Sequence, residues 1–294
     1  MQRYNTPSRT AFNIFNYTLF VLFGLSILAP FLNAIAISLS SADAVIGGQV
    51  RLWPVGFQLD AYHKLVNNTT FMRSAVNTVF LTVVNTILDI VVSLAAAYAL
   101  SHKDLIGKRT VFVFLLITMY FGGGLIPTYL LVTGMGLQNS YWALILPGIA
   151  NTFYIIVYKN TIDQLPRELL DAAEVDGANE FAMLFRIIVP MVLPMSMAFT
   201  IFSAVAHWNM WFGVALYIRD KDLWTLQYQL REILINAQLV NNETGMEMAR
   251  GEIPITPENL KMAAVMITVL PIIVIYPFVQ KYFIKGQFVG AVKG

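Results

Sequence analysis

The sequence predicts an all-α integral membrane protein with six transmembrane helices and a helical loop between the fourth and the fifth. The first observation is composition: of 294 residues, 57% are hydrophobic and 12% are charged, whereas soluble domains carry about 25% charged residues. The second is length, because six apolar segments each approach the roughly 20 residues that cross the hydrocarbon core of a bilayer. We read the whole chain, residues 1–294, as a single transmembrane domain.

The apolar segments set the expected order of spans. The first run follows Arg3 and Arg9, as a signal peptide would. Its apolar stretch of about 20 residues exceeds the 7–15 residues of a signal sequence, so we interpret it as a retained span. The expected spans are residues 15–39, 74–100, 111–132, 141–158, 191–218 and 262–283, with the helical loop at 160–190.

The third segment contains its own interruption. Gly122, Gly123, Gly124 and Pro127 lie in its middle, which predicts a broken or kinked helix packed against its neighbours. These glycines do not form a phosphate-binding loop, because no Lys-Ser or Lys-Thr pair follows at the required spacing. The chain is therefore not expected to bind ATP, or any other cofactor, by itself.

Several functional classes are disfavoured by composition. The chain has no cysteine, which removes thiol chemistry and zinc-thiolate sites. Its histidines are scattered at His63, His102 and His207, so neither a metal site nor a catalytic constellation is expected. A formal net charge of +2 gives no argument for nucleic acid.

Basic residues in short loops predict the orientation. Lys103, Lys108 and Arg109 lie between the second and third spans, and such residues favour the cytoplasmic side. Both termini and the 160–190 loop are then cytoplasmic. The long loops 40–73 and 219–261 face outward.

The 160–190 loop is predicted to form two short helices around Gly177. Pro166 suits the first helical position, and Glu168 lies in the first turn, where the helix dipole favours a carboxylate. Leu169, Ala172 and Ala173 share a face at i, i+3 and i+4. Such a face is apolar and shallow, as a docking surface would be.

Gly177 is predicted to end the first helix in a left-handed conformation, and Asn179 to cap the next. The second helix then presents an apolar stripe closed by Pro190 before span five. This stripe consists of Phe181, Leu184, Phe185 and Ile188. The alternative interpretation of residues 160–190 is an amphipathic loop that lies on the membrane surface.

Polar stripes on two spans mark a candidate pathway, because polar groups in hydrocarbon normally face a bundle or water. Aromatic rings and an amide follow the second stripe, and a tryptophan face suits a sugar ring. Helix packing and interfacial anchoring are the alternatives. The candidates are Asn85, Asp89, Ser203, His207, Trp208, Asn209 and Trp211.

The loop resembles the signature loop of ABC importer permeases. The match runs through Asp171-Ala172-Ala173, Asp176-Gly177-Ala178 and Ile188-Val189-Pro190, with Asp171 in place of glutamate and Val189 in place of leucine. Phe185 and Arg186 resemble the form common in carbohydrate permeases. The tail 290–294 resembles the end of the smaller maltose-type permease subunit, and residues 122–131 resemble a subgroup associated with complex oligosaccharides such as alginate.

The resemblance implies a sugar importer working by alternating access. The loop would be a coupling helix that docks on a cytoplasmic ATPase. Implied partners are a second homologous permease, two ATPase subunits that bind ATP and Mg, an extracytoplasmic sugar-binding protein meeting loop 219–261, and the inner membrane of a bacterium. The implied coupling residues are Glu168, Leu169, Asp171, Ala172, Ala173, Asp176, Gly177, Phe181 and Phe185.

Two other readings stay open at this point. A permease of the same superfamily for amino acids, peptides or another small solute would share the loop. An ion-coupled secondary transporter would need intramembrane acidic residues or an inverted repeat. Asp89 alone gives this second interpretation little support.

Overall fold

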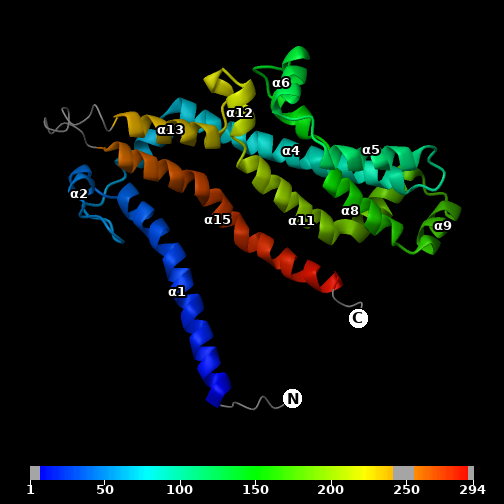
Figure 1. The fold of residues 1–294 in the computed structure, drawn as a ribbon, viewed down its shortest axis with the longest axis horizontal. Helices are drawn as coiled ribbons and strands as arrows, with labels where there is room; N and C mark the ends of the chain where they lie inside the picture. Colours follow the sequence, from blue (N-terminus) through cyan, green and yellow to red (C-terminus); the bar gives the residue numbers. More distant parts are fainter. Residues whose placement is uncertain (1–6, 241–254, 291–294) are drawn as a thin grey trace. The chain divides into compact units, whose positions relative to one another are not determined.

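The computed structural model describes residues 7–240 and 255–290, and within those ranges every regular element is a helix. Figure 1 shows the helices coloured in chain order, and they divide into two compact units. One unit comprises residues 1–69 and 230–270, and the other comprises residues 70–229 and 271–294. The single domain expected over 1–294 stays a prediction, and each unit is described separately.

Up to six segments are long and apolar enough to cross a membrane, in agreement with the expected count. Four are continuous helices: Pro7–Ser38, Thr69–Ser101, Glu180–Trp208 and Pro257–Pro277. Two more are bent pairs, Lys108–Tyr120 with Leu125–Gly134 and Trp142–Gly148 with Thr152–Asp163. The protein is therefore an all-helical membrane protein, and the count reaches six when each bent pair is one span.

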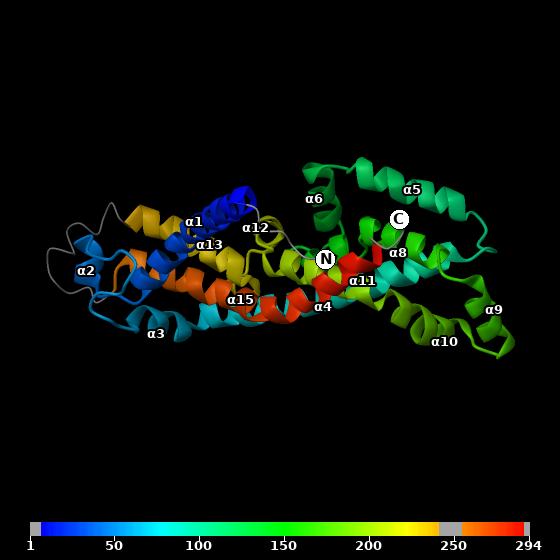
Figure 2. The ribbon, with the colours of Figure 1, turned by 90° about the horizontal axis from the view of Figure 1, so that it is seen from below.

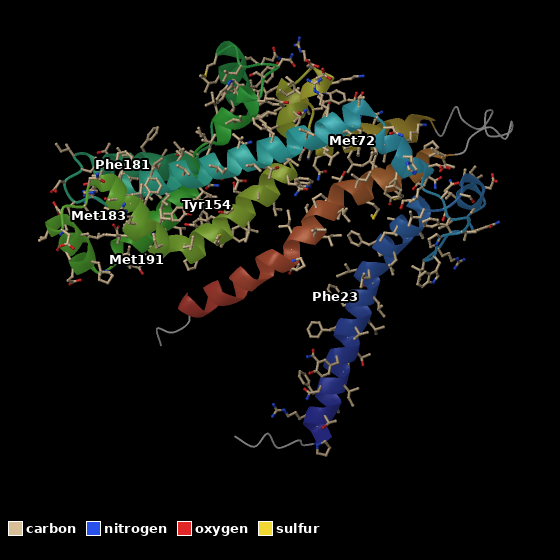
Figure 3. All side chains as sticks on the ribbon, turned by 180° about the vertical axis from the view of Figure 1, so that it is seen from behind. Phe23, Met72, Tyr154, Phe181, Met183 and Met191 are labelled. Carbon is tan, nitrogen blue, oxygen red and sulfur yellow. The ribbon has the colours of Figure 1, made fainter. Side chains whose placement is uncertain are left out.

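The first unit contains α1 (Pro7–Ser38), α2 (Ala42–Ile46), α3 (Asp60–Val66) and the start of α15 (Pro257–Gly290). Apolar side chains cover the surface of α1, and Phe23 projects outward from it (Figure 3). Its far end is fastened by the buried Asn259, whose Nδ2 donates to Ile37 O at 2.7 Å and to Ser40 O at 2.9 Å. The unit is thus tied where α1 ends and α15 begins.

The second unit carries the loop and both polar stripes. Figure 2 places α9 and α10 at the end of the unit where α4 and α8 also finish. Its elements are α4 (Thr69–Ser101), α5 (Lys108–Tyr120), α6 (Leu125–Gly134), α7 (Trp142–Ile145), η1 (Leu146–Gly148), α8 (Thr152–Asp163), α9 (Arg167–Val175), α10 (Glu180–Ala182), the π-helical η2 (Met183–Ile188), α11 (Val189–Trp208), α12 (Phe212–Tyr217), η3 (Lys221–Leu223), the beginning of α13 (Leu226–Val240) and the part of α15 from Pro271 onward.

Aromatic contacts hold α8 and α11 together near their middles. The rings of Tyr154 and Phe199 stack with centroids 4.2 Å apart, and Tyr158 meets Phe199 edge-on at 5.1 Å. Tyr158 is fully buried. Such pairs add about 0.5–1.5 kcal/mol each beyond the area they bury. The three rings belong to a hydrophobic core to which α4 also contributes buried side chains.

The third and fourth spans are broken. The predicted interruption of span three is confirmed: α5 and α6 meet at 115°, with Gly124 at φ 88°. The fourth span, expected over 141–158, is also bent, by 41° between Trp142–Gly148 and Thr152–Asp163, and the sequence did not predict this break. Pro147 supplies no N–H there, and Asn151 starts a new helix by accepting from Phe153 N at 3.0 Å.

The fifth span differs from its prediction at both ends. Pro190 was expected to close the loop before a span over 191–218, but helix continues from Glu180 to Trp208. The π-turn at Met183–Ile188 precedes Pro190, and this wider turn accommodates a ring that cannot donate an N–H. At the other end, α11 stops at Trp208 and α12 is separate.

The outer loop expected over 219–261 contains the helix α13, and residues 241–254 lie outside the described residues. Its first part is bound to α4 by Asn77, which is buried. Asn77 Nδ2 donates to Asp222 O at 2.7 Å and to Trp224 O at 3.0 Å. Tyr141 Oη donates to Asn77 Oδ1 at 2.8 Å. The start of the loop is therefore held by one amide with three partners.

Candidate functional site

The 160–190 loop turns at Gly177, as predicted. Gly177 has φ 80°, in the left-handed region, and its N–H bonds Glu174 O at 3.0 Å. Ala178 N–H reaches back to Ala173 O at 2.9 Å, which satisfies a terminal carbonyl of α9. Pro166 lies one residue earlier than predicted, as the residue that precedes the helix. The end of the helix thus depends on a conformation that glycine adopts without steric cost.

The buried face of α9 is not the predicted one. Leu169, Ala172 and Ala173 were expected to share an exposed apolar face. Ala173 instead packs with Leu170 against the chain's own core, while Leu169 and Ala172 are exposed. Leu169 and Leu170 are adjacent, so sequence spacing alone did not decide which of them faces inward. Val175, which the sequence analysis passed over, is 88% exposed.

The second helix begins as predicted and then departs from its predicted stripe. Asn179 Oδ1 accepts from Ala182 N at 2.8 Å, which confirms the cap. Phe181 is 75% exposed and Phe185 is 57% exposed, whereas Ile188 is fully buried. The π-turn widens the helix, so Met183 joins Ile188 in the core five residues away. Figure 3 labels Phe181 and Met183 on this segment.

The exposed side of the loop therefore combines carboxylates with apolar side chains. Exposed apolar groups among charges are typical of a surface that another protein covers. We call this set the loop surface: Glu168, Leu169, Asp171, Ala172, Val175, Asp176, Phe181 and Phe185.

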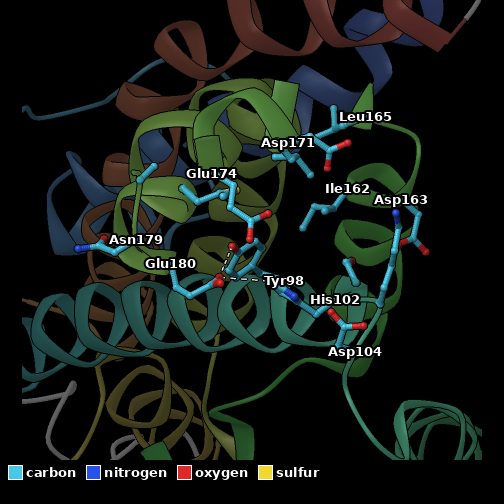
Figure 4. Close-up of a pocket in the computed structure, with 15 residues that line it drawn as sticks. Tyr98, His102, Asp104, Ile162, Asp163, Leu165, Asp171, Glu174, Asn179 and Glu180 are labelled. Carbon is cyan, nitrogen blue, oxygen red and sulfur yellow. Dashed lines mark hydrogen bonds and ion pairs between the residues drawn. The ribbon is translucent and has the colours of Figure 1, made fainter. Parts of the chain in front are cut away.

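A cavity of about 480 Å³ lies behind the loop surface (Figure 4). The end of α4, the end of α8, and α9 with α10 enclose it. Its wall is rich in carboxylates and also carries one lysine. The lining residues are Tyr98, Ser101, His102, Lys103, Asp104, Ile162, Asp163, Leu165, Leu170, Asp171, Glu174, Ala178, Asn179, Glu180 and Met183.

Glu180 crosses this cavity to the end of α4. Tyr98 Oη donates to Glu180 Oε2 at 2.6 Å, and His102 Nε2 lies 3.1 Å from the same oxygen. The dashed lines in Figure 4 mark both contacts. No local spacing predicts this group of side chains, because Glu180 lies 82 residues from Tyr98 in the chain.

The polar stripes of α4 and α11 meet at one point. Ser203 Oγ donates to Asp89 Oδ2 at 2.8 Å, and both side chains are buried. His207 lies one helical turn beyond Ser203 on α11. Asn85 Nδ2 points to Leu144 O at 3.5 Å. The structure thus brings Asp89 and Ser203 together.

The remaining candidates lie around the end of α11. Trp208 borders an apolar cavity of about 280 Å³ that α4, α11 and α15 line. Asn209 Nδ2 donates to Val205 O at 2.8 Å, and its Oδ1 accepts from Gln227 Nε2 at 2.9 Å. Trp211 contacts Phe212 edge-on at 5.4 Å. Across residues 7–240 and 255–290, no cluster of three metal-ligating side chains is placed to hold an ion.

Known proteins resemble this chain over almost its whole length. One relative, the polygalacturonan/rhamnogalacturonan transport system permease protein YtcP of Bacillus subtilis (strain 168), is 36% identical over 96% of this chain and 98% of its own. The arabinooligosaccharides transport system permease protein AraQ of the same organism is 28% identical over 99% of both chains.

A solved structure has the same fold. It is a chain from the crystal structure of a bacterial ABC transporter involved in the import of the acidic polysaccharide alginate. The TM-score is 0.88 at 28% identity, over 96% of this chain and all of that one. Residues 110–288, more than half of the sequence, match the family described as binding-protein-dependent transport system inner membrane component. The chain belongs to this family of ABC transporter permeases.

Proposed function

We propose that this chain is a permease subunit of an ATP-driven importer that carries acidic oligosaccharides across a bacterial inner membrane by alternating access. The observation that carries the proposal is the full-length likeness to a chain of an alginate importer. The polygalacturonan in the name of the first relative is, like alginate, a polymer of uronic acids. Uronate oligomers are therefore the substrate class that these two proteins share, whereas the arabinooligosaccharides in the name of AraQ are neutral sugars.

The partners follow from this assignment. Two cytoplasmic ATPase subunits bind ATP and Mg, a second homologous permease completes the pathway, and an extracytoplasmic sugar-binding protein meets the outer loop 219–261. Both termini are cytoplasmic. The family description, which names a binding-protein-dependent system, supports the binding-protein partner.

The loop surface is the proposed contact with the ATPase. Its support is the exposure of apolar side chains, Val175 above all, on a segment that also carries carboxylates. A nucleotide-driven movement of the ATPase then acts on a helix that is continuous with span five, since Glu180 begins the segment that ends at Trp208. The chain itself performs no covalent chemistry.

Tryptophan at Ala172 is expected to block docking, whereas tryptophan at Ala173 is expected to disturb the fold. Ala172 is exposed, so a large ring there projects toward the partner. Ala173 packs against the chain's own core, and overpacking costs about 1–3 kcal/mol. The measurements are ATPase co-purification and the thermal stability of the permease. If Ala172→Trp binds ATPase like wild type, the loop surface is misplaced.

Uptake of a labelled uronate oligosaccharide by the reconstituted complex tests the transport proposal. His207→Leu and Trp211→Ala are expected to reduce uptake at matched complex abundance. An imidazole donor and an aromatic face suit an anionic sugar, whereas the Asp89 carboxylate would repel it. Ser196→Ala, at the inner end of α11, should have a smaller effect. Unchanged uptake in the His207→Leu, Trp211→Ala double variant would reassign both residues to packing.

A further inference from the structure

We propose that Glu180 latches the coupling loop to the inner end of α4, so that a movement driven by the ATPase is passed to span two as well as to span five. This inference rests on the proposed function. Its basis is the pair of contacts at one carboxylate oxygen, 2.6 Å from Tyr98 Oη and 3.1 Å from His102 Nε2. Hydrogen bonds to an ionised carboxylate are roughly twice as strong as neutral ones.

Both sides of the latch are held in place. On the loop side, the left-handed turn at Gly177 and the Asn179 cap fix the position at which Glu180 starts its helix. On the α4 side, Tyr98 is buried, and its ring meets that of His102 edge-on at 5.4 Å. The buried Tyr98 donor is therefore held in position before the bond to Glu180 forms.

A second connection joins α4 to the helix Glu180–Trp208. We call the two connections, together with the two helix segments that run between them, the frame. Ser203 bonds Asp89 in the middle of the bundle. Between Asp89 and Tyr98 the frame follows nine residues of α4, or about 14 Å of helix, whereas between Glu180 and Ser203 it follows 23 residues, or about 35 Å. Span five must therefore diverge from α4 between the two connections, and α8 fills the space through the stacked Tyr154.

The frame limits how the loop can move. The space inside the frame is filled by the packed side chains of α8. Protein interiors change between discrete packing arrangements more readily than they deform continuously. A displacement of the loop then has two outcomes. Either the Glu180 contacts break and only span five responds, or the contacts hold and α4 moves with the loop. In productive transport, the Glu180 contacts hold and α4 moves with the loop.

The test uses the whole complex, with its second permease, ATPases and binding protein, reconstituted in vesicles. The measured quantity is labelled oligosaccharide imported per ATP hydrolysed. Glu180→Gln and the isosteric Tyr98→Phe are each expected to lower this ratio about fivefold, less than the full value of a hydrogen bond to a charged group, because the Glu180 side chain is 65% exposed and solvent screens the contact. ATP hydrolysis should continue. Glu180→Gln removes the charge of the acceptor and Tyr98→Phe removes the donor of the same hydrogen bond, so the loss in the double variant should be smaller than the two single losses combined.

Asp104→Asn is the matched control, since it removes a carboxylate from the same cavity wall and leaves the latch intact. Its ratio should equal that of wild type. A wild-type ratio in both Glu180→Gln and Tyr98→Phe would overturn the latch. Loss of ATPase assembly in either variant would also overturn it, by making the group a folding or docking site. If wild type imports no oligosaccharide, the proposed function fails instead.

Discussion

Replacing Gly177 with valine is expected to abolish substrate-stimulated ATP hydrolysis, and replacing it with asparagine is expected to preserve most of it. Gly177 has φ 80°. The left-handed region costs an L-residue about 1–2 kcal/mol, and a β-branched side chain is a genuine outlier there, whereas asparagine is enriched. No atom lies within 4 Å of a Cβ at this position, so the effect arises from the backbone and not from a clash.

The measurement is ATP hydrolysis by the reconstituted complex with and without loaded binding protein. Gly134→Val is the control, because its Cβ also meets open space but its backbone is helical. A Gly177→Val variant that couples as well as Gly177→Asn would mean that the α9 turn does not position the loop surface.

The substitution Asn77→Leu is expected to lower the free energy of unfolding of the permease more than any other single substitution considered above. Asn77 is 6% exposed and bonds two carbonyls and one hydroxyl. Leucine leaves the carbonyls of Asp222 and Trp224 without this donor, and each such loss costs about 1–3 kcal/mol. We expect a total loss of about 3 kcal/mol, measured as a lower thermal unfolding temperature of the purified permease.

The matched control is Asn160→Leu, which makes the same chemical change on the exposed side of α8. Its unfolding temperature should differ little from wild type. Faster proteolysis near Asp222 in Asn77→Leu would show that the start of the outer loop has come free. If both leucine variants unfold together at the wild-type temperature, Asn77 does not fasten this loop.

Local signals predicted the parts of the fold that depend on local physics. Apolar length was enough to find the spans, because each must bury about 20 residues in lipid whatever its neighbours are. The glycines at 122–124 predicted the break in span three, and Gly177 and Asn179 predicted the turn of the loop. In each case one residue type has a conformational preference that its surroundings do not override.

The predictions that were wrong concern features of the structure that tertiary packing determines. Leu169 and Leu170 are equally apolar neighbours, and only the core under α9 selects Leu170. Pro190 is normally a helix breaker, yet the π-turn before it lets the helix continue. No sequence pattern singled out Glu180, because its two contacts are with residues of α4 that lie far away in the chain. Long-range polar contacts of this kind leave no periodicity in the sequence.

The π-turn at Met183–Ile188 is the place where this segment can lose a residue without a change of helical phase. A π-turn holds one residue more than an α-turn but turns the helix by about the same angle. Deleting a single residue here would therefore restore a regular α-helix and leave the side chains on its N-terminal side facing nearly the same way relative to span five. Deleting a residue from the regular α-helix after Pro190 would instead rotate everything on its N-terminal side by about 100°. Tolerance to single-residue deletion is therefore expected to be confined to the π-turn.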